Sequence, residues 1–189
     1  MAARWSVCIG VALLCLLGCA EEASVAETKQ GGKAMAITVT STAFAQGKPI
    51  PKRHTGEGED LSPALAWMGV PEGTKEIVLI CDDPDAPTAE PWVHWVIYRI
   101  PPTATGLPEA VPKQEKLPDG SKQGKNSWPR LGYNGPMPPP GHGTHRYFFK
   151  VYALDALTDL EPGATKRDVL KAIDGHIVAE GELMGTYER

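Results

Sequence analysis

The chain has 189 residues, and 23 acidic against 19 basic side chains give it a formal net charge of −4 at neutral pH. A nucleic-acid-binding protein needs a basic face, so this balance argues against nucleic acid as a partner. It also gives no general attraction to anionic lipid surfaces, and the length is that of one domain.

The amino-terminal residues are typical of an export signal. Arg4 precedes an apolar run from Val7 to Leu17 that is too short to span a bilayer as a helix. Leu16-Leu17-Gly18-Cys19 resembles a bacterial lipoprotein cleavage box. We therefore expect residues 1–18 to be a lipoprotein signal peptide and Cys19 to carry the lipid that anchors the exported chain, facing the periplasm or the cell exterior. An ordinary secretory leader cleaved nearby is the alternative.

Cysteine use follows from this cleavage. Cys8 and Cys15 leave with the signal peptide and Cys19 is acylated, so only Cys81 remains and no intramolecular disulfide can form. Cys81 ends an apolar run and is predicted to be a small buried side chain. Residues 19–34 are polar and are expected to be a disordered tether, with the folded domain at residues 35–189.

Apolar runs and alternation predict several strands and one helix in the domain. The polar stretch 43–63 and the Gly- and Pro-rich stretch 106–140 are expected to be loops, and long loops of this kind are often functional. The predicted strands are 37–40, 64–67, 76–81, 92–100, 146–154 and 177–187, the last after a helical or irregular start. A capping box at Thr165–Asp168 opens a helix that ends near Gly175. The expected fold is mainly β: an antiparallel sandwich with one or two peripheral helices.

Two carboxylates and a histidine lie at or between the predicted strands 76–81 and 92–100. Asp83 and Asp85 flank Pro84, which is good turn chemistry, but they are also candidates to orient a histidine or to bind a ligand ammonium. Alternation indicates that only one of the two points inward. His94 lies on a buried strand, and a hydrogen bond donated by its ring to a nearby carboxylate would favour its charged form.

The Pro/Gly-rich loop 135–143 leads to two more imidazoles, His142 and His145, at the start of the next strand. With His94 they supply enough nitrogen for a zinc site. Anion binding explains the neighbouring glycines better, since exposed N–H groups beside a partly protonated histidine suit phosphate, sulfate or carboxylate. We therefore expect no metal and no cofactor.

Three motifs in this order resemble the phosphatidylethanolamine-binding protein family, and most closely its short bacterial branch of Raf-kinase-inhibitor-like proteins. They are Asp-Pro-Asp-Ala-Pro at 83–87, Trp-x-His at 92–94, and Gly-Pro-x-Pro-Pro-x-Gly-His-Gly-x-His-Arg-Tyr at 135–147. The resemblance covers residues 36–189. It implies a Greek-key β-fold and a pocket in which a lipid head-group phosphoryl or similar anion lies between these motifs.

Carried over to this chain, the resemblance identifies twelve ligand-binding candidates. They are Asp83, Asp85, Ala86, Pro87, Trp92, His94, Gly135, Met137, Pro138, Pro139, His145 and Tyr147. It also makes the segment Gly124-Lys125-Asn126 a loop anchor. Met137 replaces a glycine common in eukaryotic members and is expected either to fill part of the pocket or to replace a backbone contact. The sequence ends without the C-terminal helix that borders the pocket in those members, and we expect a more open site.

The function predicted first is non-enzymatic binding of a phosphorylated or anionic small molecule, with modulation of a protein partner as a further role. No Gly-x-Ser-x-Gly elbow surrounds Ser62 or Ser127, so no catalytic residue is assigned. One alternative is a hydrolase that uses His94, His142 or His145 with Asp83 as acid, base or metal ligands. Another is a protease inhibitor, since some members of the family inhibit a serine carboxypeptidase.

Overall fold

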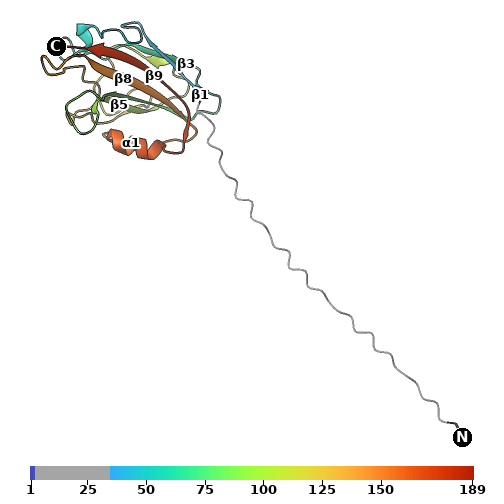
Figure 1. Ribbon diagram of the computed structural model, residues 1–189. Coiled ribbons are helices and arrows are strands. Elements are labelled where there is room, and N and C mark those ends of the chain that lie inside the picture. The colour runs from blue at the N-terminus through green and yellow to red at the C-terminus, as the bar shows by residue number, and fades with distance from the viewer. Residues whose placement is uncertain (3–34) are drawn as a thin grey trace. The chain divides into compact units, whose positions relative to one another are not determined.

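The computed structural model describes residues 1–2 and 35–189. The predicted signal peptide, Cys19 and the tether therefore lie outside the described residues. The folded part contains nine strands, one α-helix and one short 3₁₀ helix among those residues (Figure 1). The elements are β1 Met35–Ala36, β2 Thr38–Ser41, η1 Lys52–His54, β3 Leu65–Met68, β4 Glu76–Asp83, β5 Trp92–Ile100, β6 Gly106–Leu107, β7 Lys122–Gln123, β8 His145–Leu154, α1 Lys166–Ile173 and β9 Ile177–Tyr187.

The strands form two sheets. The larger has six strands in the order β1-β9-β8-β4-β5-β7, and the smaller has the order β2-β3-β6. All neighbours pair antiparallel except β1 and β9, which are parallel. Because β4, β5 and β7 are adjacent and β8 returns beside β4, the large sheet contains a Greek key. The predicted mainly β, antiparallel sandwich is confirmed.

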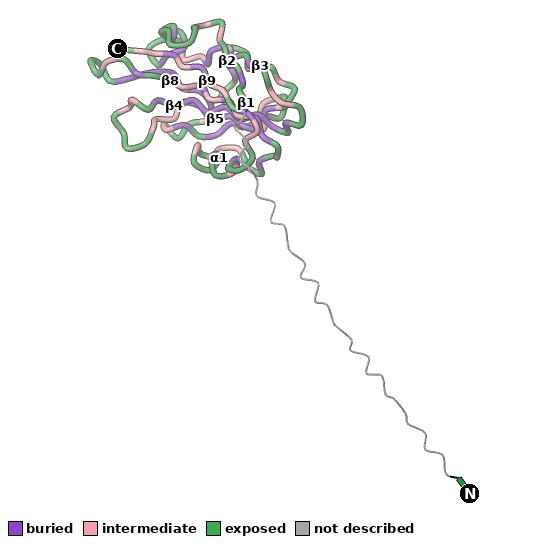
Figure 2. Tube along the Cα trace, turned by 45° about the vertical axis from the view of Figure 1, so that its right-hand side comes forward, coloured by how far each residue is buried: buried purple, intermediate pink, exposed green. Residues whose placement is uncertain are grey.

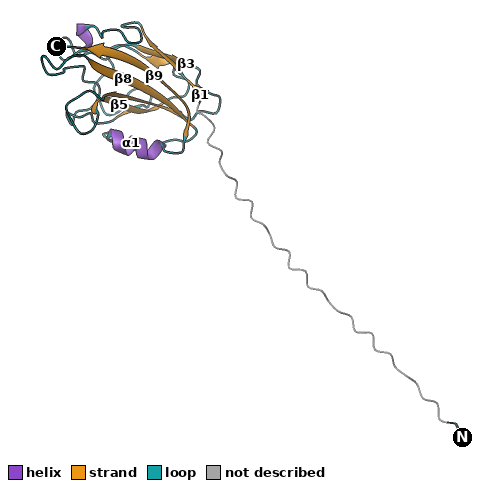
Figure 3. Ribbon diagram, in the orientation of Figure 1, coloured by secondary structure: helices purple, strands orange, loops and turns teal. Residues whose placement is uncertain are grey.

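Two hydrophobic cores cover opposite faces of the large sheet. Ile77, Leu79 and Cys81 of β4 pack toward the small sheet, whereas Val78 and Ile80 join the cluster beneath helix α1. Successive strand residues point to opposite faces, so a strand covered on both sides is apolar at nearly every position. Figure 2 shows this burial along the central strands, and Figure 3 shows the helix on one side of the sheet.

The predicted capping box is present. The Thr165 side chain accepts from the Asp168 N–H, and the Asp168 carboxylate accepts from the Thr165 N–H at 2.9 Å. Val169 and Ile173 are buried against the sheet, while Leu170 is half exposed. The helix starts where the sequence predicts and ends at Ile173, two residues before Gly175.

Two predicted elements differ from the structure. The predicted first strand, 37–40, corresponds to β2, and the unpredicted strand β1 precedes it in the other sheet, so that the chain crosses between the sheets at Ile37. The backbone passes so close to β9 that a Cβ on Gly181 would lie 1.9 Å from the Ile37 oxygen, so only glycine fits there. The predicted helical or irregular start of 177–187 is wrong: β9 is a strand from Ile177 because it pairs with β8 along its whole length.

The two long loops are packed rather than loose. In the first, η1 places His54 in the interior, with its ring nitrogen Nδ1 3.0 Å from the Leu61 oxygen. In the second, β7 adds an edge strand, and the Gln123 side chain accepts from the Trp95 indole at 2.9 Å. The first contact folds its loop on itself, and the second ties its loop to the middle of β5.

Candidate functional site

A pocket of about 250 Å³ opens where β4 ends and β5 and β8 begin. It joins residues from all three sequence motifs. The lining residues are Asp83, Ala86, Pro87, Thr88, Trp92, His94, Trp128, Met137, Pro138, Pro139, His145 and Tyr147. Ten of the twelve sequence-predicted ligand residues therefore come together here, and Asp85 and Gly135 lie outside the lining.

Asp83 and His145 form a buried pair at the base of this pocket. The His145 ring nitrogen Nδ1 lies 2.7 Å from Asp83 Oδ2, and both residues are nearly inaccessible to solvent. The other Asp83 oxygen accepts the backbone N–H of Asp85 at 2.8 Å. The second His145 nitrogen, Nε2, lies 2.8 Å from Nδ1 of the exposed His142. A chain of hydrogen bonds thus runs from a buried carboxylate through two imidazoles to the surface.

His94 has a different partner from the one predicted. Its Nδ1 lies 2.6 Å from the Asn134 backbone oxygen, so the predicted carboxylate–imidazole bond at His94 is wrong; the carboxylate pairs with His145 instead. A carbonyl only accepts, so the neutral ring carries its proton on Nδ1 and leaves Nε2 as an acceptor. Burial lowers the pKa of His94 from its ordinary value, which favours this neutral form.

Aromatic rings surround His94. Tyr147 and Trp128 each meet its ring edge-on, with centroids 5.1 and 5.2 Å away, and Trp92 meets Trp128 at 5.2 Å. The Tyr147 hydroxyl is fully buried and has no hydrogen-bond partner among the described residues. Burial raises the pKa of Tyr147 strongly, so the hydroxyl keeps its proton. The Asp83 carboxylate also raises this pKa, but no described residue places an acceptor in hydrogen-bond geometry, so the hydroxyl is a donor without a partner in the wall of the pocket.

The Pro-rich loop forms one wall, and its entry point is fixed from behind. Gly135 donates its N–H to Asp60 at 2.6 Å, and the Asn134 side chain donates to the same carboxylate at 2.9 Å. A Cβ on Gly135 would lie 2.2 Å from the His54 oxygen, so the close approach requires glycine. Gly135 therefore shapes the loop from behind, while the half-exposed Met137 lines the pocket itself.

Asn126 is the loop anchor of the upstream segment. Its buried amide donates to the Gly132 and Asn134 oxygens, and its oxygen accepts from the Trp128 and Arg130 N–H groups. These four bonds shape the turn that brings Trp128 to the pocket. Trp128 and Thr88 are lining residues that the sequence did not indicate; the signal for Trp128 was an aromatic residue within a Pro/Gly-rich loop.

Asp85 points away from the pocket. Its carboxylate receives two side-chain bonds from Arg146, at 2.8 and 2.9 Å, and one from the Arg146 backbone N–H at 2.9 Å. These hydrogen bonds hold the pKa of Asp85 below its ordinary value. Only Asp83 of the two aspartates points inward, as alternation predicts.

Neither serine considered as a nucleophile contacts a histidine. The Ser62 hydroxyl accepts the Val111 N–H, and the Ser127 hydroxyl accepts the Val93 N–H. Within residues 35–189, no group of three or more His, Cys, Asp or Glu side chains is arranged to hold a metal ion. The described residues thus offer imidazoles and a phenol, without an activated nucleophile.

The chain is similar to known proteins over most of its described residues. A model of the phosphatidylethanolamine-binding protein family matches residues 40–188. A UPF0098 protein of Methanothermobacter thermautotrophicus is 56% identical over 153 residues, which cover 81% of this chain and 99% of the relative. A solved structure of a putative phosphatidylethanolamine-binding protein homologue from Chlamydia trachomatis shares 41% identity, with a TM-score of 0.74 and coverage of 82% and 99%. The solved structure of E. coli YbcL, described as a new member of the mammalian family, shares 36% identity and gives a TM-score of 0.76. The match covers 81% of this chain and 98% of YbcL.

Proposed function

Because the chain belongs to the phosphatidylethanolamine-binding protein family, we propose that its histidine pocket binds a small phosphorylated ligand and performs no reaction on it. The observation that carries this proposal is the Tyr147 hydroxyl, a buried donor without a partner among the described residues. A buried polar group without a hydrogen bond is costly, and a ligand oxygen would satisfy it. A phosphoryl group offers several such acceptors.

The groups in and beside the pocket favour an anionic ligand only when a proton is available for a hydrogen bond between them. That proton can be carried by a histidine ring or by the ligand itself. Asp83 is anionic and paired with His145, and the neutral His94 offers an acceptor at Nε2. An anion therefore binds well only when one of these nitrogens is protonated, or when the phosphoryl group itself donates. Binding should accordingly strengthen as the pH falls through the histidine range.

The volume and the walls limit the organic part of the ligand. About 250 Å³ is below the size of sites that bury drug-sized molecules, roughly 300 Å³ or more. The indoles of Trp92 and Trp128 offer π-faces to a cation. A phosphoryl group joined to a short ammonium-bearing chain, as in a phosphoethanolamine head group, suits both features.

The absence of an activated nucleophile among the described residues supports binding over hydrolysis. Neither Ser62 nor Ser127 is bonded to an imidazole, and the Cys81 thiol is buried, which raises its pKa well above the ordinary value. His145 is bonded to a carboxylate, as a general base would be, but the group it faces at Nε2 is another histidine. We therefore propose a ligand-controlled interaction with a protein partner as the output of the site.

The test is a titration of the purified full chain with inorganic phosphate and with phosphoethanolamine, followed by NMR of the histidine rings. Saturable shifts of His94 and His145 are expected, together with a loss of affinity of about tenfold or more for His145→Ala. His176→Ala is the matched control, since His176 is exposed and pairs only with Asp155. Equal losses in the two variants, or no shift in wild type, would overturn the proposed function.

We also propose that the exported chain is held at a membrane through Cys19. No helix among the described residues is long and apolar enough to cross a bilayer. Because Cys19→Ser removes the thiol that would carry the lipid, this variant should move the protein from the membrane fraction to the soluble fraction. A variant that stays with the membrane would show that the lipid anchor is wrong.

A further inference from the structure

Both ring nitrogens of His145 are already occupied within the protein. Nδ1 faces the Asp83 carboxylate at 2.7 Å and Nε2 faces His142 at 2.8 Å. Any ligand that bonds to a nitrogen of His145 must therefore displace one of these two partners. The two differ greatly in how readily they can leave.

Asp83 is fixed, whereas His142 is free to move. Asp83 is buried, lies at the end of a central strand and has its second oxygen tied to the backbone. His142 is exposed and lies between Gly141 and Gly143, both with positive φ and with open space around the Cβ position. The only side-chain hydrogen bond of His142 among the described residues is the one to His145. Displacing it would therefore cost one part-buried hydrogen bond and the edge-on contact between the two rings.

We propose that His142 is an internal competitor of the ligand: its imidazole occupies the Nε2 position of His145 that a phosphoryl oxygen takes when the pocket fills. The proposal rests on the proposed function and adds a residue that sets the affinity of the same site. His142 does not line the pocket itself, so its effect is exerted through His145. His142 is thus a positioning residue.

Proton counting makes this competition depend on pH. One proton lies between the two facing nitrogens, and the His145 proton at Nδ1 is shared with Asp83. The imidazole pair can therefore carry a charge of zero or +1 and keep its hydrogen bond. A second added proton places two N–H groups face to face, so the bond breaks and His142 leaves. An acidic solution thus frees His145 in the state that donates to an anion.

Other charged and titratable groups near this pair are already engaged. Arg146 is paired with Asp85, and Glu188 accepts from the Thr144 hydroxyl. Arg189 faces Glu57, and its backbone oxygen accepts the Gly141 N–H. The titratable and charged residues on the segments packed around the two imidazoles, of which Asp83 bonds to His145 directly, are Asp83, Asp85, His94, Arg146, Tyr147, Tyr187, Glu188, Arg189 and Glu57.

The experiment compares inorganic phosphate binding to the full chain in wild type, His142→Ala and His176→Ala by calorimetry at pH 7.5 and about pH 5. At pH 7.5 we expect His142→Ala to bind about threefold to tenfold more tightly than wild type, the factor for removing one competing hydrogen bond. At the lower pH this advantage should shrink below about twofold. His176→Ala should match wild type at both values. Comparing proteins at one pH cancels the titration of phosphate itself.

The outcomes separate this inference from the proposed function. Phosphate binding by wild type with equal or weaker binding by His142→Ala would overturn the competitor role and leave the anion pocket standing. Binding seen only in His142→Ala would support both. Absence of binding in both proteins would overturn both. NMR adds a direct readout: the His142 ring should shift toward the values of a solvated imidazole as phosphate is added, and an unmoved ring would contradict its displacement.

Discussion

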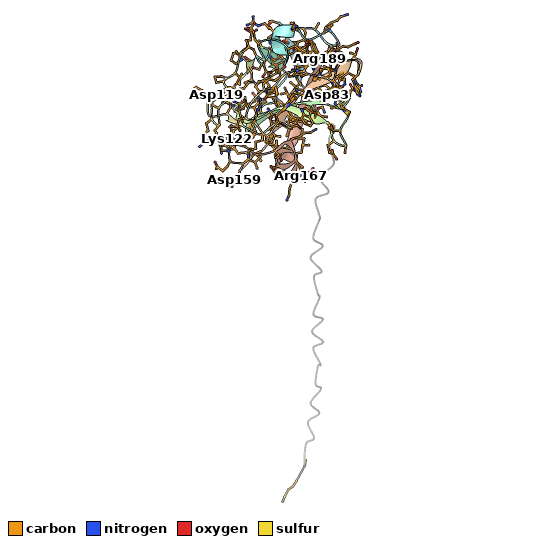
Figure 4. The ribbon with its side chains drawn as sticks, turned by 90° about the vertical axis from the view of Figure 1, so that its left-hand side faces the viewer. Asp83, Asp119, Lys122, Asp159, Arg167 and Arg189 are labelled. Carbon is orange, nitrogen blue, oxygen red and sulfur yellow. The ribbon has the colours of Figure 1, made fainter. Side chains whose placement is uncertain are left out.

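Two adjacent carboxylates, Asp82 and Asp83, end strand β4 on opposite faces of the large sheet. Both are buried, and both are paired with cations or potential cations. Asp82 lies on the helix side, where Lys150 approaches to 3.0 Å and Lys166 of helix α1 is bonded as well. Asp83 lies on the sandwich side and faces His145. Figure 4 labels Asp83 in the upper half of the domain and Arg167, near the start of helix α1, at its lower end.

The partners, rather than the carboxylates, distinguish the ion cluster beneath the helix from the pocket that we propose to bind a ligand. Lysine stays charged throughout the physiological pH range, so the Asp82 cluster has one state and fixes the helix to the sheet. Histidine changes charge near neutrality, and its second nitrogen can bond to something else. The Asp83 region therefore has several states and an opening to solvent. Substitution of Asp82 should therefore lower mainly the unfolding free energy, and substitution of Asp83 should lower mainly the affinity for phosphate.

The largest effect on stability is expected for Asp82→Asn. Removing the charge leaves two partly buried ammonium groups without their counter-ion. We expect a loss of about 2–4 kcal/mol in unfolding free energy, somewhat below the roughly 3–5 kcal/mol for a fully buried pair, because both lysines can turn to solvent. Chemical denaturation measures it. Phosphate affinity should stay within about twofold of wild type, and a large loss would mean that the two faces are not independent.

Asp83→Asn should do the reverse. The amide oxygen can still accept from His145 Nδ1, so the loss of stability should be only about 1–2 kcal/mol. Without the carboxylate, donation from His145 to a phosphoryl oxygen is supported less, and phosphate affinity should fall by about tenfold or more. Denaturation and calorimetry on the same protein give both numbers. If Asp83→Asn were as unstable as Asp82→Asn and bound phosphate normally, Asp83 would have a structural role and no role in binding.

Sequence predicted the functional side of this comparison better than the structural side. The alternation in residues 77–83 places Asp82 and Asp83 on opposite faces, and the three motifs brought ten of twelve predicted residues to the pocket. The role of Asp82 was not predicted, because its partners Lys150 and Lys166 are separated from it by 68 and 84 positions in the sequence. Local pattern carries no signal for such a distance.

The errors at the site have the same origin. His94 was expected to meet the carboxylate just before it, because proximity in sequence suggested proximity in space. Its strand instead carries it beside the Asn134 carbonyl, 40 residues away, while the carboxylate reaches His145 across the β4–β8 pairing. Trp128 was missed because its position depends on the turn that Asn126 shapes. Register and turn geometry, rather than residue type, decide both.

The pH dependence of stability tests the buried histidine next to the Asp83 region. Burial lowers the pKa of His94 in the folded chain below the unfolded value of about 6.5. The stability from its neutral form is therefore complete above about pH 6.5 and is lost as the pH falls through the folded pKa. His94→Asn should remove this slope. Denaturant titrations of both proteins from pH 8 to 5 measure it, and identical slopes would mean that His94 does not titrate.

The smallest effect is expected at Arg146, whose partner Asp85 is the exposed counterpart of the two buried aspartates. Hydrogen bonds from Arg146 hold the pKa of Asp85 below its ordinary value. Their stabilisation should be complete above the unfolded pKa of about 3.9 and should disappear as the pH falls through the folded pKa. The difference in unfolding free energy between wild type and Arg146→Gln should therefore be small and constant from pH 7 to about pH 4 and vanish below. Because the Arg146 side chain is half exposed and lies outside the pocket lining, phosphate affinity should be unchanged. A clear loss of affinity would show that the Asp85–Arg146 pair holds the pocket-lining loop in place. Asp85 would then contribute to ligand binding together with Asp83, although its side chain does not line the pocket.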